Sequence, residues 1–209
     1  MKTKTLPRSE TIRFGWDIAK LNLVFFIKLF IVFIVVTYAA QALKTEFDGR
    51  ATLLAGIFLI VSIVIGTIME LGFLKIVLNF ADSKPSTIST LFSITSARTV
   101  INYFVADTVF GVLVIVGLFL LIVPGIYLAL KFQYYQYLIV DKDMGIIDAF
   151  KKSSRLTEGV KWELFKFDLT LILIGIAGAL ALMVGLVLAI PTTMTADAKM
   201  FRKLQKLHK

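Results

Sequence analysis

The stretch RTVINYFVADTVFGVLVIVGLFLLIVPGIYLALKFQYYQYLIVD, Arg98–Asp141, decides the fold class of this 209-residue chain. It is apolar almost throughout, and about 44 residues in one helix would extend roughly 66 Å at 1.5 Å per residue. That length is about twice the thickness of the hydrocarbon core of a bilayer. Because Pro and Gly interrupt helices, VPG at Val123–Gly125 predicts a turn between two membrane helices, about Ala97–Ile122 and about Pro124–Val140.

The composition of the whole chain agrees with a membrane protein. Hydrophobic residues make up 58% of it and the mean hydropathy is +0.86, whereas a soluble domain is typically about 45–50% apolar. The net charge of +9 fits cytoplasmic loops rich in Lys and Arg, which also meet anionic lipid headgroups. No soluble basic domain is evident that would hold a nucleic acid, so we expect membrane lipids and not nucleic acid as partners.

The residue types needed for common catalytic chemistry are missing. The chain has no Cys, and its one His is His208, near the C-terminus. A thiolate metal site is thereby excluded, and a His-based triad, zinc site or haem site inside the fold is not expected. We therefore predict no enzyme activity, no catalytic or metal-binding residue and no cofactor.

The remaining apolar runs complete a six-span prediction. The first helix is predicted at about Gly15–Leu43 and the second at about Thr52–Phe80. In the last run, a hydropathy window favours one helix, Leu169–Pro191, which would leave the basic tail KMFRKLQKLHK outside. Two helices, about Val160–Ala179 and about Leu182–Leu204, place that tail in the cytoplasm and satisfy the positive-inside rule. With six spans, the chain is a multi-pass protein of the inner membrane with both termini cytoplasmic.

Two similar octapeptides indicate an internal repeat. WDIAKLNL at Trp16–Leu23 and WELFKFDL at Trp162–Leu169 share Trp, an acid, Lys and Leu at matching positions. We expect each to lie where the chain turns from the interface into the membrane, because Trp prefers headgroup depth.

The predicted fold class is an all-α polytopic membrane helix bundle, a single transmembrane domain over residues 1–209. Its six transmembrane helices form three hairpins, each preceded by an interfacial amphipathic segment, in units of about 9–80, 86–141 and 146–205.

The clearest interfacial segment is Ile146–Leu156, since STISTLFS at Ser86–Ser93 and SETIRFGW at Ser9–Trp16 are weaker candidates. Its apolar side chains follow helical spacing and its basic side chains occupy the other side, as in a helix lying in the membrane interface. The aromatic run FQYYQY at Phe132–Tyr137 is expected to anchor the cytoplasmic end of the fourth helix. The predicted interfacial anchors are Trp16, Trp162, Lys151, Lys152 and Arg155.

Polar residues recur at a common depth within the predicted helices, on the order of 12–15 Å from the cytoplasmic end. A charge there costs at least about 2.5–3.5 kcal/mol on insertion scales, so it should face the bundle interior, a partner or water. In one interpretation Glu70 or Asp107 pairs with Lys131 or Lys28 and joins the helices. In the other, the layer lines a cavity open to the cytoplasm that holds a cation, a proton or a lipid headgroup. The candidate polar layer comprises Asn22, Lys28, Glu70, Asp107, Lys131, Asp168 and Asp197.

Two functions follow from these patterns. The first is an integral inner-membrane protein without catalytic activity, an accessory protein that interacts with lipids or with a membrane protein partner. The second is a small transporter or channel, with the polar layer lining its path. A homo-oligomer is compatible with either, because several copies of so small a chain could together enclose a pathway.

The segment PGIYLALKFQYYQYLIVDKDMGIIDAFKKSSRLTEGVKW, Pro124–Trp162, and the tail IPTTMTADAKMFRKL, Ile190–Leu204, carry a resemblance. They resemble the membrane domain of bacterial glycerophosphodiester phosphodiesterases and of related small uncharacterised polytopic membrane proteins. The resemblance implies a six-helix bundle. It implies no phosphodiesterase activity, because the catalytic barrel of that family is a separate soluble domain with no counterpart in these residues. The matching elements are Pro124-Gly125, the acidic turn Asp141–Asp143, and Ala149, Ser153 and Gly159 in an A-x3-S-x5-G run.

Overall fold

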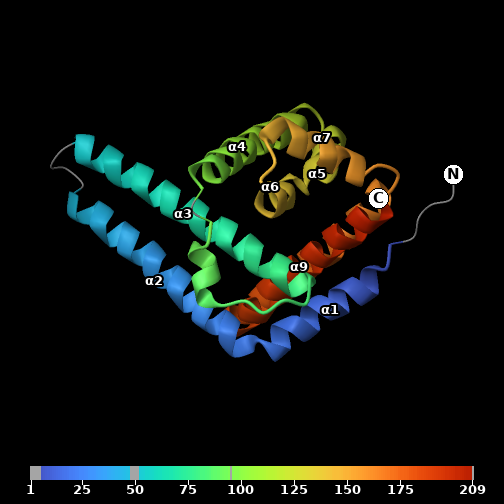
Figure 1. Cartoon of the computed structure of the whole chain (residues 1–209), viewed down its shortest axis with the longest axis horizontal. Helices are drawn as coiled ribbons and strands as arrows, with labels where there is room; N and C mark the ends of the chain where they lie inside the picture. Colours follow the sequence, from blue (N-terminus) through green and yellow to red (C-terminus); the bar gives the residue numbers. More distant parts are fainter. Residues whose placement is uncertain (1–5, 48–51, 95, 209) are drawn as a thin grey trace.

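The computed structural model describes residues 6–47, 52–94 and 96–208, and the regular structure within these ranges is entirely helical (Figure 1). The predicted all-α class is therefore confirmed. The elements are α1 (Arg8–Leu21), α2 (Leu23–Phe47), α3 (Thr52–Ala81), the short 3₁₀ helix η1 (Ile88–Phe92), α4 (Ala97–Leu120), α5 (Ile122–Phe132), α6 (Tyr135–Lys142), α7 (Ile146–Leu156), α8 (Lys161–Leu180) and α9 (Leu182–Leu207).

Part of this helical structure is long and apolar enough to cross a membrane. Within the described residues two segments meet that condition by length and composition, Leu59–Ala81 in α3 and Ala97–Leu120, which is all of α4. A third is added if α1 and Leu23–Val36 of α2 count as one broken span. These segments indicate a membrane protein, whereas the six predicted spans and three hairpins stay a prediction.

The first predicted helix, Gly15–Leu43, is wrong as a single rod, because α1 and α2 meet at Asn22 with a bend of 79°. The Ile18 carbonyl accepts two hydrogen bonds of 3.0 Å from Asn22, one from its backbone N–H and one from its side-chain Nδ2. The bend lets α1 lie along α9, and Gly15 packs directly against the α9 backbone. A Cβ at Gly15 would overlap the carbonyl oxygen of Thr192.

The turn between α4 and α5 lies slightly earlier than VPG predicts. Leu121 has an extended backbone (φ −163°, ψ 140°) and separates the two helices. Pro124 then falls in the first turn of α5, where a missing N–H breaks no intrahelical hydrogen bond. Gly125 fits closely against Gly117 of α4, since a Cβ at Gly117 would lie 2.9 Å from the Gly125 Cα.

The fourth predicted helix, Pro124–Val140, is also wrong as a continuous element. The chain leaves the helix after Phe132 and re-enters it at Tyr135. Side chains of α7 bond to the interrupted backbone: the Tyr134 N–H donates to Ser153 Oγ at 3.1 Å, and Thr157 Oγ1, just after α7, donates to the Lys131 carbonyl at 3.1 Å. These bonds join residues about 20 positions apart, so the local pattern of Pro124–Val140 could not anticipate them.

Figure 1 shows α2 and α3 running side by side, α1 doubling back along α9, and α4 to α7 grouped together. The main core lies where α6 meets α3, α4, α7 and α9. The predicted interfacial position of FQYYQY is wrong in this respect, because Tyr134, Tyr135 and Tyr137 are at most 3% exposed. They are central core residues, and Tyr137 stacks on Phe201 of α9 at 5.1 Å between ring centroids.

Candidate functional site

Two pairs of acidic side chains flank the buried tyrosines of α6. On one side, Tyr135 Oη donates a hydrogen bond of 2.6 Å to Asp107 Oδ1 of α4, and Gln136 Nε2 lies 3.4 Å from the same oxygen. Glu70 of α3 interacts electrostatically with Asp107 and with the buried Tyr103. The first pair is thus Glu70 with Asp107, of which Asp107 accepts the Tyr135 hydroxyl.

The second pair is Asp168 of α8 with Asp197 of α9. Tyr137 Oη donates a 3.0 Å hydrogen bond to Asp197 Oδ2, while Asp197 Oδ1 is buried without a hydrogen-bond partner. The Tyr134 hydroxyl interacts electrostatically with both carboxylates. The tyrosines therefore separate two acidic pairs that α3 and α4 supply on one side and α8 and α9 on the other.

The structure arranges four members of the predicted polar layer as two separate pairs and leaves the other three elsewhere. Asn22 caps the break between α1 and α2. Lys28 is exposed on α2, and the Lys131 Nζ lies 5.0 Å from the centre of the Phe132 ring. Within the described residues neither lysine forms an ion pair with Glu70 or Asp107, so the interpretation of the layer as acid–lysine pairs has no such contact to support it.

Arg202 of α9 binds two carboxylates at the ends of other helices, Asp82 just after α3 and Asp141 near the end of α6. Its Nε and Nη2 donate to the two oxygens of Asp82 at 2.8 and 2.7 Å. Its Nη1 and Nη2 donate to Asp141 at 2.6 and 2.8 Å. Burial alone would raise the pKa of the Asp141 carboxyl, but the hydrogen bonds and charge of Arg202 hold that pKa below its ordinary value of 3.8.

A basic groove of about 590 Å³ is lined by residues of α4, α5 and α7. Its charged side chains are Lys131, Lys151 and Arg155, and no carboxylate is among the described residues that line it. None of these three cations forms an ion pair within the part of the chain that the structure describes. The remaining lining is Leu113, Phe132, Ile147, Phe150 and Ser154.

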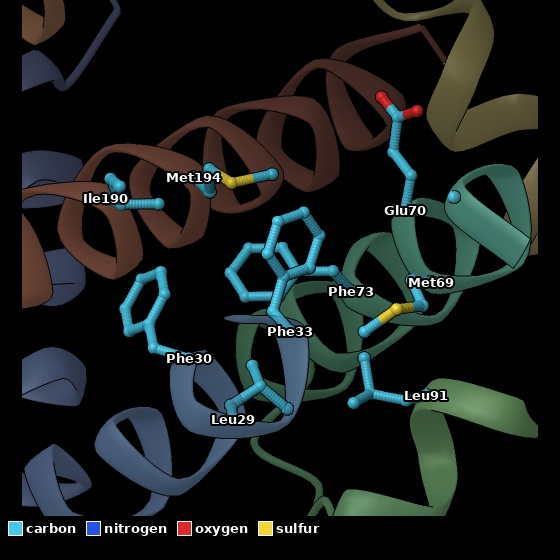
Figure 2. A pocket seen from close by; sticks show the side chains of 10 residues that line it. Leu29, Phe30, Phe33, Met69, Glu70, Phe73, Leu91, Ile190 and Met194 are labelled. Carbon is cyan, nitrogen blue, oxygen red and sulfur yellow. The ribbon is translucent and has the colours of Figure 1, made fainter. Parts of the chain in front are cut away.

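An apolar cavity of about 500 Å³ lies between α2, α3 and α9 (Figure 2). Three aromatic rings face into it, those of Phe30, Phe33 and Phe73. Glu70 stands at one end of the cavity and is the only charged residue among the described residues that line it. The rest of the lining is Leu29, Gly66, Met69, Leu91, Ile190 and Met194.

The predicted interfacial anchors lie on the outer surface. Trp16 is 42% exposed and Trp162 is 66% exposed. Lys151 and Arg155 are exposed, and Lys152 is half-buried. A bilayer would cover these two indole rings if the anchors lie at its interface, and that placement stays a prediction.

The described residues contain no group of three or more His, Cys, Asp or Glu side chains positioned to hold a metal ion. The interior also contains the hydroxyl groups of Tyr103, of Tyr134 just before α6, and of Tyr135 and Tyr137 in α6, none of which the sequence analysis placed in the polar layer. The signal was present in FQYYQY, but its burial depends on packing with α3 and α9. Ser153 in α7 and Thr157 just after it carry a weaker signal, a spacing of four residues that places two side chains on the same side of a helical turn.

These features define a class, a helical protein whose longest apolar segments are able to span a membrane. The chain belongs to the DUF975 family, described as a protein of unknown function, whose profile matches residues 87–208. The matched region includes η1 and every element from α4 to α9. No curated protein and no solved structure matches the chain.

Membership of this family agrees with the predicted likeness to small uncharacterised proteins. No match links the chain to a glycerophosphodiester phosphodiesterase, so that part of the resemblance stays a prediction.

Proposed function

We propose that this chain is a multi-pass protein of the inner membrane, without catalytic activity, that binds anionic lipids at its cytoplasmic face. In this proposal six spans form three hairpins, each preceded by an interfacial segment, and both termini are cytoplasmic. The order of the elements supports it, since α1, η1 and α7 each precede a pair of contacting helices, α2 with α3, α4 with α5, and α8 with α9.

The basic groove beside α7 is the observation that carries the proposal. Lys131, Lys151 and Arg155 surround it without carboxylate partners, and Ile147, one of its apolar side chains, is 68% exposed. An anionic phospholipid presents a negative headgroup next to acyl chains, which matches a cationic rim beside apolar side chains. The predicted amphipathic character of Ile146–Leu156 belongs to the same proposal.

The test compares melting temperatures in neutral detergent with and without added lipid. A ligand that binds the folded state alone raises its stability, so phosphatidylglycerol should raise the melting temperature more than phosphatidylcholine does. The triple variant Lys131→Gln, Lys151→Gln and Arg155→Gln should lose the difference between the two lipids. The matched control changes three exposed cations elsewhere, Lys84, Arg98 and Lys142, to Gln.

Equal stabilisation of all three proteins by phosphatidylglycerol would show that the groove is not the lipid site. Equal stabilisation by both lipids would contradict selection of anionic headgroups. Either result would favour a membrane protein partner or a second copy of the chain over an anionic lipid as the ligand.

A second candidate function, a small transporter or channel, is favoured by the depth of two acids. Glu70 lies at the middle of Leu59–Ala81 and Asp107 close to the middle of Ala97–Leu120. Because the chain has no Cys, single Cys substitutions at these two positions can be tested with an impermeant thiol reagent. Labelling from both faces of sealed vesicles would support transport, and labelling from the cytoplasmic face alone would support a ligand site.

A further inference from the structure

The cavity between α2, α3 and α9 combines an apolar body with one negative charge in the middle of a span. We propose that this cavity binds a hydrophobic organic cation, a molecule with an apolar body and a single positive charge that lies beside Glu70. The site is separate from the basic groove, so it does not depend on the lipid proposal above. Seven of its ten lining residues lie on α2 and α3, outside the family match, and the other three, Leu91, Ile190 and Met194, lie within it.

The size and lining of the cavity suit an organic ligand. Its volume of about 500 Å³ falls within the range of roughly 300–1,000 Å³ usual for small-molecule sites. Phe30, Phe33 and Phe73 present aromatic faces, which attract cations through the charge distribution of the ring. Met69 and Met194 add flexible thioether side chains that adapt to irregular apolar shapes.

The charge of Glu70 determines the sign of the ligand. Glu70 is exposed and lines the cavity at the middle of Leu59–Ala81. A carboxylate at that depth is costly unless it is paired, and within the described residues Glu70 forms no ion pair. Its electrostatic neighbour Asp107 is also acidic, so a positive ligand would be attracted to this end of the cavity, whereas an anionic ligand would be repelled.

Figure 2 shows how the cavity separates the two parts of such a ligand. Glu70 stands at one end, and Phe30 and Leu29 lie toward the other, with the rings of Phe33 and Phe73 between them. A cation at the Glu70 end would therefore extend its apolar part along the aromatic rings toward α2.

Gly66 provides a way to close the cavity without disturbing the helix. It lines the cavity, and a Cβ at this position meets no atom within 4 Å. The substitution Gly66→Leu should project a side chain into the space that the ligand would occupy, and Leu favours helix more than Gly does. Gly175 of α8 likewise has room for an added Cβ but does not line the cavity, so Gly175→Leu is the matched control.

The experiment measures equilibrium binding of tetraphenylphosphonium to the full chain in lipid nanodiscs. Tetraphenylborate, an anion of nearly the same shape, serves as the charge control. We expect saturable binding of the cation, weakened at least about tenfold by Glu70→Gln because a charge-assisted contact is lost. Gly66→Leu should weaken it by a similar factor, while Gly175→Leu and Glu158→Gln, at an exposed acid outside the cavity, should bind as the wild type does.

Three results would overturn the proposal. One is unchanged binding by Glu70→Gln, which is isosteric and therefore informative even if Gly66→Leu does not fold. Another is equal saturable binding of tetraphenylborate, which would identify an apolar groove filled by lipid chains. The third is no saturable binding of the cation by wild-type protein that is monodisperse and helical.

Discussion

Arg202 is the side chain at which three separate parts of the chain meet. It belongs to α9 and bonds to Asp82 just after α3 and to Asp141 near the end of α6. A guanidinium group offers a planar fork of donors that matches two carboxylates, whereas an ammonium group has no such geometry. Arg202 is 16% exposed at its side chain, so solvent only partly screens these pairs.

Replacing Arg202 by Lys should therefore destabilise the protein despite keeping the charge. We expect a loss on the order of 1–2 kcal/mol, because hydrogen bonds to Asp82 and Asp141 are lost and cannot all be replaced. Thermal unfolding in detergent measures the effect. Arg98→Lys, at an exposed position without an ion pair among the described residues, should leave the melting temperature nearly unchanged, and equal melting temperatures of both variants would contradict the role of Arg202.

The contact between Arg202 and Asp141 predicts that the stability of the protein depends on pH. The pKa of Asp141 is held below its ordinary value of 3.8 by Arg202, against the effect of burial. Because the pKa of Asp141 is lower in the folded state, its pair with Arg202 contributes its full stabilisation at pH values above the ordinary pKa of Asp141. That stabilisation is lost as the pH falls through the lowered pKa of Asp141 in the folded protein.

Melting temperatures of wild type and Asp141→Asn, recorded between neutral pH and about pH 2, measure this contribution. The wild type should be the more stable of the two at neutral pH, and the difference should shrink below about pH 4. A difference that stays constant over the whole range would contradict an ionised Asp141 paired with Arg202.

At the scale of the elements, α7 determines where the chain between α5 and α6 leaves the helix. Ser153 accepts from the Tyr134 N–H and donates to the Lys131 carbonyl at 3.3 Å. Irregular backbone inside a membrane protein is tolerated where neighbouring side chains satisfy it. Each residue of the A-x3-S-x5-G run therefore has a structural role. Beside Ser153, Ala149 is fully buried, and Gly159 has a φ of 75°, a backbone conformation that favours Gly.

Ser153→Ala should destabilise the protein by about 1–3 kcal/mol, because it leaves the buried Tyr134 N–H without its acceptor. The matched control is Ser154→Ala, one position further along α7 at a half-buried site. Thermal unfolding of both variants gives the comparison. Hydrogen exchange at Tyr134 should also be faster in Ser153→Ala, and unchanged exchange would contradict the bond.

The crossing of α1 and α9 depends on Gly15. Its substitution by Ala gains helix propensity, about 1 kcal/mol, but the new Cβ would overlap the Thr192 carbonyl, a backbone atom that cannot simply rotate away. We expect a net destabilisation of about 1–3 kcal/mol from overpacking. Gly111→Ala in α4, where a Cβ meets nothing within 4 Å, should be neutral or stabilising in the same melting experiment.

At the scale of the whole molecule, charged contacts gather at one end. Glu10 at the start of α1 pairs with Lys203 at 2.9 Å, and Arg8 lies 3.4 Å from Glu163 of α8. The start of α1 and the end of α9 are therefore together at this end (Figure 1). In the proposed topology this end is cytoplasmic, where basic residues are concentrated.

Single Cys substitutions at helix connections test that topology in a chain without native Cys. With six spans, Leu121→Cys between α4 and α5 and Ala181→Cys between α8 and α9 should react with an impermeant thiol reagent from the outer face. Ser83→Cys and Glu158→Cys should react from the cytoplasmic face. Reaction of Ala181→Cys from the cytoplasmic face would contradict a crossing by α8 and α9.

Apolar periodicity and breakers were sufficient to predict most helices. Thr52–Phe80 and Ile146–Leu156 were predicted almost as α3 and α7 occur, because long apolar runs and amphipathic spacing are local properties of the chain. The candidate site was predicted in part. Acids inside apolar runs are conspicuous, so Glu70 and Asp107 could be named from the sequence, but the hydrogen bond from Tyr135 to Asp107 could not.

The sequence by itself determined an all-helical chain with segments apolar enough for a membrane, since composition and local spacing decide these properties. Only the tertiary structure decided the breaks at Asn22 and after Phe132, the burial of the α6 tyrosines and the absence of acid–lysine pairs among the described polar-layer residues. The physical reason is distance along the chain. Each of these features depends on contacts between segments far apart in sequence, such as α7 with the α5–α6 break and α9 with α1, and a local pattern carries no information about them.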